Sequence, residues 1–185
     1  MPRRPSKRAF DAYRNARREA GLPAPGTDRF AYAALAYVGD TDEEGVRIGS
    51  KLLWFLNTSL KQAPQYSRLL PGRTPPEIAA QNYRTQPRPG APVVRRPADS
   101  LIGITGEQAI ARGILCAGNP DTVYRQIMDI HETVGGFGHF IFIGRSGFLD
   151  HQEAEKGIRL LAREVLPRLP MATTTGAAES ARAAE

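Results

Sequence analysis

The sequence has a single cysteine, a single tryptophan and no long apolar run. Because Cys116 is the only cysteine among 185 residues, an internal disulfide framework and a cysteine-based zinc site are excluded. No apolar run reaches the roughly eighteen residues of a membrane span, and the basic N-terminus lacks the apolar segment of a secretory signal. We therefore expect a cytoplasmic protein that does not associate with membranes. Apolar residues make up 41% of the chain, enough to build one globular domain.

Groups of catalytic or metal-ligating residues are missing as well. The three histidines form no pair at a spacing typical of metal ligands. No nucleophile–base set or carboxylate pair stands out, so the sequence assigns neither a metal ligand nor a catalytic residue. The glycine-rich segment 135–138 precedes a predicted strand, whereas a dinucleotide-binding fingerprint follows a strand and opens a helix. A dinucleotide-binding domain is therefore not expected.

The positive charge is unevenly distributed along the chain. The net charge is +6, yet residues 1–20 alone hold seven Lys and Arg against two acidic residues. Residues 68–96 hold six against one, so the rest of the chain is net acidic. A nucleic-acid-binding module would more often present one basic face with interleaved aromatic residues. We expect these charges to be solvated, and we expect no nucleic-acid partner.

The remaining patterns predict an α/β fold. Apolar strands alternate with amphipathic segments that carry helix caps, such as Asn119-Pro120-Asp121 and Asp150 with Glu153. Such an alternation is typical of a parallel sheet. The strand at 30–38 is nearly continuously apolar, which predicts burial on both faces. The predicted elements are a helix capped by Ser6 over 6–20, a strand over 30–38, a helix over 42–60 after the capping pattern Thr41 to Glu44, a proline-rich excursion over 61–100, a helix or turn over 106–112, a strand over 113–118, a helix over 119–134, a strand over 139–143, a helix over 150–166 and a disordered tail over 171–185.

Three stretches follow one another in a recognisable order. The first, 29–44, is an apolar strand that ends in VGDTDEE. The second, 113–135, reads GILCAGNPDTVYRQIMDIHETVG. The third and most specific, 136–169, reads GFGHFIFIGRSGFLDHQEAEKGIRLLAREVLPRL. In order and spacing they resemble the C-terminal portion of the luciferase-like, or bacterial luciferase, family of flavin-dependent monooxygenases, over roughly residues 5–169.

The resemblance implies a fold and a domain arrangement. Residues 1–170 would form the C-terminal portion of a (β/α)₈ TIM barrel, with its last three strands and their helices. The excursion at 61–100 would be the late insertion of the family, a cover over the active site. A complete barrel needs about 250 residues, so the chain would be a truncated part. We expect a homo-oligomer or a partner chain to supply the missing strands.

The resemblance also implies an oxidoreductase that uses FMN or a deazaflavin, with a small organic substrate and molecular oxygen. Barrel active sites lie at the carboxyl ends of the strands, which here are followed by two candidate cofactor-binding segments. The first is Gly144, Arg145 and Ser146, because arginine suits phosphate. The second is Gly118 and Asn119, where the N-terminus of a helix offers N–H groups to an anion. The glycines permit close approach of the backbone.

Two alternatives stay open beside this interpretation. In the first, the glycines serve only to turn the chain and Asn119 serves only to cap a helix. In the second, the whole chain is a non-catalytic half-barrel that acts as an association or scaffold subunit. Its open strand edges and apolar surface would make a lone monomer improbable under either hypothesis.

Overall fold

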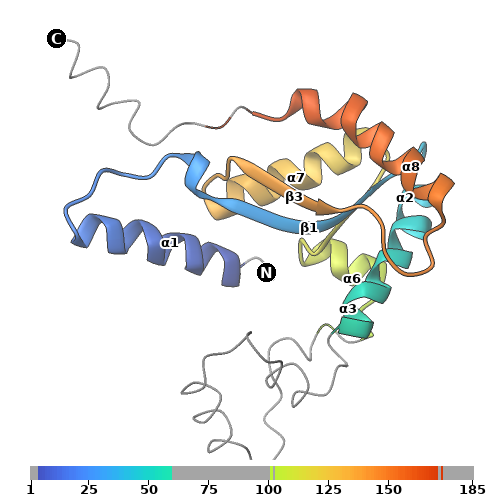
Figure 1. Cartoon of the computed structure of the whole chain (residues 1–185), viewed down its shortest axis with the longest axis horizontal. Coiled ribbons are helices and arrows are strands. Elements are labelled where there is room, and N and C mark those ends of the chain that lie inside the picture. The colour runs from blue at the N-terminus through green and yellow to red at the C-terminus, as the bar shows by residue number, and fades with distance from the viewer. Residues whose placement is uncertain (1–3, 60–100, 102, 171, 173–185) are drawn as a thin grey trace, which may run out of the picture. The chain divides into compact units, whose positions relative to one another are not determined.

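The fold is known from a computed structural model that describes residues 4–59, 101, 103–170 and 172 (Figure 1). The predictions made for the excursion at 61–100, and for the tail apart from residue 172, lie outside these residues. Contacts divide the chain into two compact units, Met1–Leu53 with Thr105–Glu185, and Trp54–Ile104. The candidate site residues all belong to the first unit, which is mixed α/β.

The first unit is built on a parallel sheet of three strands, β1 (Ala31–Val38), β2 (Leu115–Gly118) and β3 (His139–Ile143). All three were predicted from their apolar runs. Their order in the sheet is β2-β1-β3. Successive strands of a barrel would lie in chain order, with β1 at an edge; here β1 is in the centre. β3 pairs with the first half of β1, residues 31–35, and β2 pairs on the other side with its second half, residues 35–38.

The strand order places helices on both faces of the sheet. The chain moves from β1 to one side through α2 (Asp42–Gly49) and α6 (Gly106–Ala111) to reach β2. It then moves in the opposite direction through α7 (Pro120–Val134) to reach β3. Because parallel crossovers are right-handed, opposite directions put the crossing helices on opposite faces.

The face toward α7 carries the main core. Tyr32, Ala34, Ala36 and Val38 alternate along β1 and pack against α7, as expected for side chains two residues apart on a strand. Phe137 stacks on Tyr32 at 5.6 Å between ring centroids. The other buried members of this core are Phe30, Cys116, Val123, Ile127, Ile130, Val134, Leu161 and Val165.

The opposite face is covered only in part. Leu35 and Tyr37 are buried there, beneath α2, but Ala31 and Ala33 on the same face are exposed. Ile141, level with Ala33 on the neighbouring strand, is 55% exposed. The prediction that the strand is buried on both faces is therefore correct only for its carboxyl-terminal half, where α2 lies.

Helix α1 (Arg4–Glu19) begins two residues before Ser6, so Ser6 is not its N-cap. Its aromatic residue Phe10 packs on Phe30 at 4.7 Å between ring centroids. Arg14 lies 4.5 Å from the centroid of the Phe30 ring and donates hydrogen bonds to the carbonyls of Val134 (3.1 Å) and Gly135 (2.7 Å). One arginine thereby ties α1 to the end of α7 and satisfies carbonyls that a helix terminus leaves free.

The predicted helix over 42–60 is interrupted. Helix α2 ends at Gly49, a short 3₁₀ turn covers Ser50–Leu52, and α3 (Leu53–Ser59) follows. The Ser50 hydroxyl donates to the Val46 carbonyl at 2.6 Å, a back-bond that bends helices. The final helix, α8 (His151–Leu160), continues through a π-type turn at Leu161–Val165 and a 3₁₀ turn at Leu166–Arg168, close to the predicted end. Its predicted capping box is confirmed by Asp150 and Glu153.

Candidate functional site

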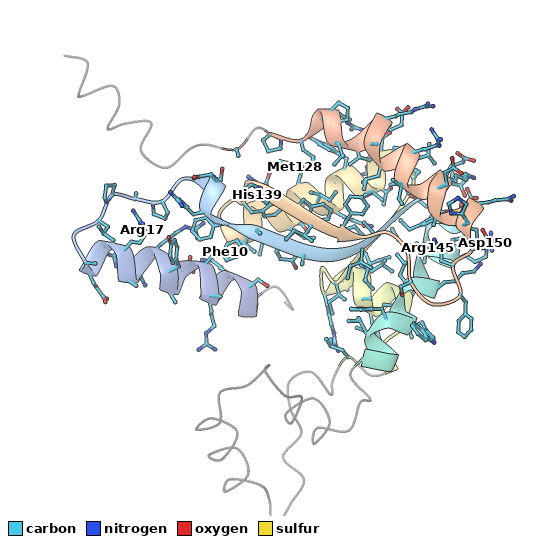
Figure 2. The ribbon with its side chains drawn as sticks, viewed as in Figure 1. Phe10, Arg17, Met128, His139, Arg145 and Asp150 are labelled. Atoms are coloured by element: carbon cyan, nitrogen blue, oxygen red, sulfur yellow. The ribbon has the colours of Figure 1, made fainter. Side chains whose placement is uncertain are left out.

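The carboxyl ends of the three strands lie at one edge of the sheet, because the strands are parallel. β1 is followed by Gly39 and Asp40, β2 ends at Gly118, and β3 is followed by Gly144. In Figure 2, Arg145 and Asp150 lie at this end of the molecule, whereas His139 lies toward the opposite end of β3. Both predicted cofactor-binding segments are therefore at the edge where open α/β sheets and barrels bind ligands.

The segment after β2 is already occupied by a carboxylate of the chain. Asn119 is the N-cap of α7, as predicted, and its side chain accepts from the N–H of Thr122. The backbone N–H of Asn119, however, donates to Oδ1 of Asp42 at 2.8 Å, and the Thr122 hydroxyl donates to Oδ2 at 3.2 Å. The N–H of Asn119 itself is thus already paired within the chain. Asp42 takes the position of an anion, and its negative charge opposes the approach of a phosphate.

Gly118 has an internal reason to be glycine. Its φ is +150°, and a Cβ at this position would lie 2.7 Å from Oδ1 of Asp42 and 2.8 Å from Cγ2 of Thr122. The missing side chain therefore makes room for the contact between Asp42 and α7.

The segment after β3 is more open. Arg145 is exposed, and no described residue forms an ion pair or hydrogen bond with it. Ser146 donates to the carbonyl of Leu52 at 3.2 Å, which fixes the loop while the hydroxyl oxygen can still accept. A Cβ on Gly144 would lie 3.1 Å from the Phe142 ring and 3.2 Å from Ile158, so this glycine too serves internal packing. Arg145 is the member of the segment that is available to an anion.

The two predicted segments do not lie next to each other. They follow β2 and β3, which are on opposite sides of β1, so they are separated by two strand spacings, about 10 Å. They are also staggered, because Gly118 is level with Val38 and Ile143 with Leu35. A single phosphate group cannot contact both segments.

A charged cluster that the sequence did not indicate joins α8 to the end of β1. The ammonium of Lys156 lies 2.7 Å from carboxylate oxygens of both Asp40 and Glu44. The pKa of Lys156 is raised by its hydrogen bonds to Asp40 and Glu44, and the pKa of Glu44 is lowered by its hydrogen bonds from Lys156 and from the Asp40 N–H.

Of the predicted capping box at Thr41, only the bond from the Glu44 N–H to the threonine oxygen is present. The Glu44 carboxylate instead accepts from the N–H of Asp40.

Tyr37 lies beneath this cluster. Its ring meets Gly157 of α8, where a Cβ would come within 2.7 Å of it. The hydroxyl is buried and has no hydrogen-bond partner. Its pKa is raised, first by burial and then by the negative charge of Glu44, so the phenol is neutral at physiological pH. The sequence pattern gave no sign of this group, since Tyr37 is one of several aromatic residues in an apolar strand.

A groove of about 360 Å³ borders the cluster on α8. Its charges balance, and the arginine in it is paired with a glutamate of the same helix, Arg159 with Glu155 at 2.7 Å. The groove therefore has no unpaired charge with which to select an ionic ligand. It is lined by Asp40, Gln152, Glu155, Lys156, Arg159 and Leu160.

The histidines do not form a site. The His131 ring packs edge-on against Phe137 at 5.0 Å, and Nε2 of His139 is 3.1 Å from the Asp28 carbonyl oxygen. His151 is the exposed first residue of α8. Within the part of the chain that the structure covers, no group of three His, Cys, Asp or Glu side chains is placed to hold a metal ion. No helix in that part is long and apolar enough to cross a bilayer.

Comparison with solved structures shows a likeness to two monooxygenases. One is the monooxygenase RslO1 from Streptomyces bottropensis, with a TM-score of 0.59 and 19% identity, over 90% of this chain and 39% of that chain. The other is the oxygenating constituent of 3,6-diketocamphane monooxygenase from Pseudomonas putida, a type II Baeyer-Villiger enzyme in complex with FMN. Its TM-score is 0.54 and its identity 20%, over 90% of this chain and 40% of that chain.

At these identities the likeness concerns the fold. The chain spans about two fifths of the length of the two monooxygenases. By sequence, no protein-family profile matches it. No curated protein matches it either.

Proposed function

We propose that this chain is the C-terminal portion of a flavin-dependent monooxygenase of the luciferase-like kind, and that Arg145 binds the phosphate of FMN or of a deazaflavin. The observation that carries the proposal is the unpaired Arg145 guanidinium at the carboxyl edge of a parallel sheet. The fold it shares with two monooxygenases, one of them in complex with FMN, supports it. In this proposal β1 and β3 are neighbouring barrel strands. β2 is a short strand that pairs only with the carboxyl-terminal half of β1.

The described residues fit the phosphate end of such a cofactor. Arg145 presents a planar fork of donors that matches phosphate oxygens, and Ser146 holds the loop in place through Leu52. Gly118 and Asn119 remain candidates only if Asp42 moves away from the start of α7. When bound, the flavin supplies the redox chemistry, and the protein orients it and excludes water. The chain's own contribution is therefore binding and positioning.

We propose further that the site is completed by association, with a second copy or with a partner chain that supplies more strands. Ala31, Ala33 and Ile141 leave one face of the sheet open over its amino-terminal half. In a complete barrel, layers of side chains from other strands fill this face. A small organic substrate and molecular oxygen would then enter at the opposite, carboxyl edge.

Titration of the purified chain with FMN, followed by flavin fluorescence, tests the proposal. Replacing Arg145 with alanine removes a charge-assisted contact of about 1.5 to 3 kcal/mol, a loss of affinity of roughly tenfold to a hundredfold. The matched control is Arg159→Ala, since Arg159 is exposed but paired within its own helix, and it should leave FMN affinity unchanged. Riboflavin has no phosphate, so its affinity should not respond to Arg145→Ala.

The alternative is a non-catalytic scaffold subunit, and the internal roles of both glycines favour it. A folded wild-type chain that binds neither oxidised nor reduced FMN, alone or after association, would support this alternative. An equal loss for FMN and riboflavin in Arg145→Ala would also count against a phosphate contact.

A further inference from the structure

The outer edge of β3 lacks the features that usually prevent edge pairing. No strand of the described chain pairs with this edge, since β3 is the last strand in the order β2-β1-β3. The strand reads His139-Phe140-Ile141-Phe142-Ile143, without lysine, proline or an acidic residue. Natural proteins protect edge strands with such residues, with β-bulges, or with a helix or loop that covers the edge. Ile141 is 55% exposed, and Ile158, beside Gly144 at the end of the strand, is 42% exposed.

The backbone groups that face outward can be identified from the pairing with β1. The N–H of His139 donates to the carbonyl of Phe30 at 3.2 Å, so His139 directs its polar groups toward β1. Successive residues of a strand direct them to alternate sides. Ile141 and Ile143 therefore also face β1, while the N–H and C=O groups of Phe140 and Phe142 face the outer edge.

We propose that β3 pairs with β3 of a second copy of this chain, antiparallel and about a twofold axis at Ile141. This register makes Phe140 and Phe142 of one copy face Phe142 and Phe140 of the other. Each such pair exchanges two hydrogen bonds, so every outward backbone group of Phe140 and Phe142 is used. Ile141 then lies opposite its own copy as a non-hydrogen-bonded pair, with about 4.5 Å between the Cα atoms.

The sequence favours a second copy over a different partner. The order Phe-Ile-Phe is the same in both directions, so a twofold axis at Ile141 matches identical side chains without any unpaired charge. An isologous contact needs such self-complementarity. The dimer would continue the sheet from three strands to six. It occupies the edge at which a partner chain would add a parallel strand, so this dimer and a completed parallel barrel exclude each other at β3. It depends on the edge of β3 alone, not on flavin binding.

A designed disulfide tests this geometry directly. A Cα separation of about 4.5 Å lies within the range that a disulfide bridges, so Ile141→Cys should give a covalent dimer under mild oxidation. The native Cys116 is fully buried and does not compete. The control is Ala33→Cys, exposed on the same face but on the central strand, which should remain monomeric on a non-reducing gel. Equal cross-linking of the two variants would overturn the proposal.

Charge substitutions give a second test, by sedimentation velocity on the full chain. Wild type should form a dimer that dissociates on dilution. Ile141→Lys should weaken it by roughly tenfold or more, because like charges then lie directly opposite each other. Ile141→Glu should do the same, and mixing the two variants should restore a dimer, which also shows that both are folded. A wild-type monomer at high concentration, or a dimer unaffected by Ile141→Lys, would refute the pairing, as would a stable complex of β3 with a foreign strand.

Discussion

Helix α2 approaches β2 closely beside the candidate site, and this approach predicts the effect of a single methyl group. A Cβ on Gly45 would lie 2.5 Å from both Cα and the carbonyl oxygen of Gly118. Ordinary carbon contacts are about 3.5 to 4 Å, so Gly45→Ala must lift α2 by about 1 Å. Gly118 has little freedom to yield, because it is part of the sheet: it pairs with Val38, and its carbonyl accepts a hydrogen bond from the Gly39 N–H at 2.9 Å. The shift would loosen the packing of Ile48 and Leu52, which are 3% and 0% exposed.

The net effect follows from two opposing contributions. Alanine stabilises a helix by about 1 kcal/mol relative to glycine, while overpacking against a rigid backbone costs about 3 kcal/mol. We expect Gly45→Ala to lower the free energy of unfolding by about 2 kcal/mol and Tm by about 6 °C. Thermal and urea unfolding followed by circular dichroism measure this change.

Two controls separate the clash from other effects. In Gly49→Ala the new Cβ would lie 2.9 Å from the Cβ of Ala117 and 3.1 Å from the Cβ of Tyr37, farther than the 2.5 Å of Gly45→Ala, so a smaller shift and a smaller loss are expected. Arg47 is exposed on the same helix, and Arg47→Ala should change stability by less than about 0.5 kcal/mol. If Gly45→Ala were instead about 1 kcal/mol more stable than wild type, helix propensity alone would be acting, and α2 would not approach Gly118 as described.

Two further predictions concern the contacts around α2. Asp42→Asn keeps an acceptor for the Asn119 N–H but loses the charge at the start of α7, so we expect a loss of about 1 kcal/mol in urea unfolding. Full retention of stability would mean that the carboxylate does not hold that N–H. Lys156→Met removes the partner of Glu44 and Asp40; the groups are partly exposed, so the loss should be about 1 kcal/mol at neutral pH. Because the folded pKa of Glu44 is lowered from 4.5, this contribution is present above about pH 4.5 and lost as the pH falls through the folded value. It is likewise lost in strong base, since the pKa of Lys156 is raised above 10.5. A difference between variant and wild type that did not shrink in acid would show that the ion pair is not its cause.

Most elements of the first unit were predictable from local patterns. The apolar runs gave the three strands, and short-range signals gave the starts of α7 and α8, where Asn119 caps one helix and Asp150 and Glu153 form the capping box of the other. These signals connect residues three apart, so the chain carries them whatever its tertiary structure. The break after Gly49 was missed because the bond from Ser50 to the Val46 carbonyl competes with a helix that the apolar stripe favours.

The amino-acid sequence by itself determined an α/β chain with parallel strands, a glycine at each strand end and an arginine after β3, because each of these depends on neighbouring residues. Only the tertiary structure decided the strand order, the filling of the α7 terminus by Asp42 and the clamp between Lys156 and Glu44. The last two contacts join residues 77 and 112 positions apart, a separation at which spacing along the chain carries no information. The start of α7 and the loop after β3 are the two candidate anion sites. The packing of the helices across the sheet decides which of them stays open, because it brings Asp42 to the start of α7.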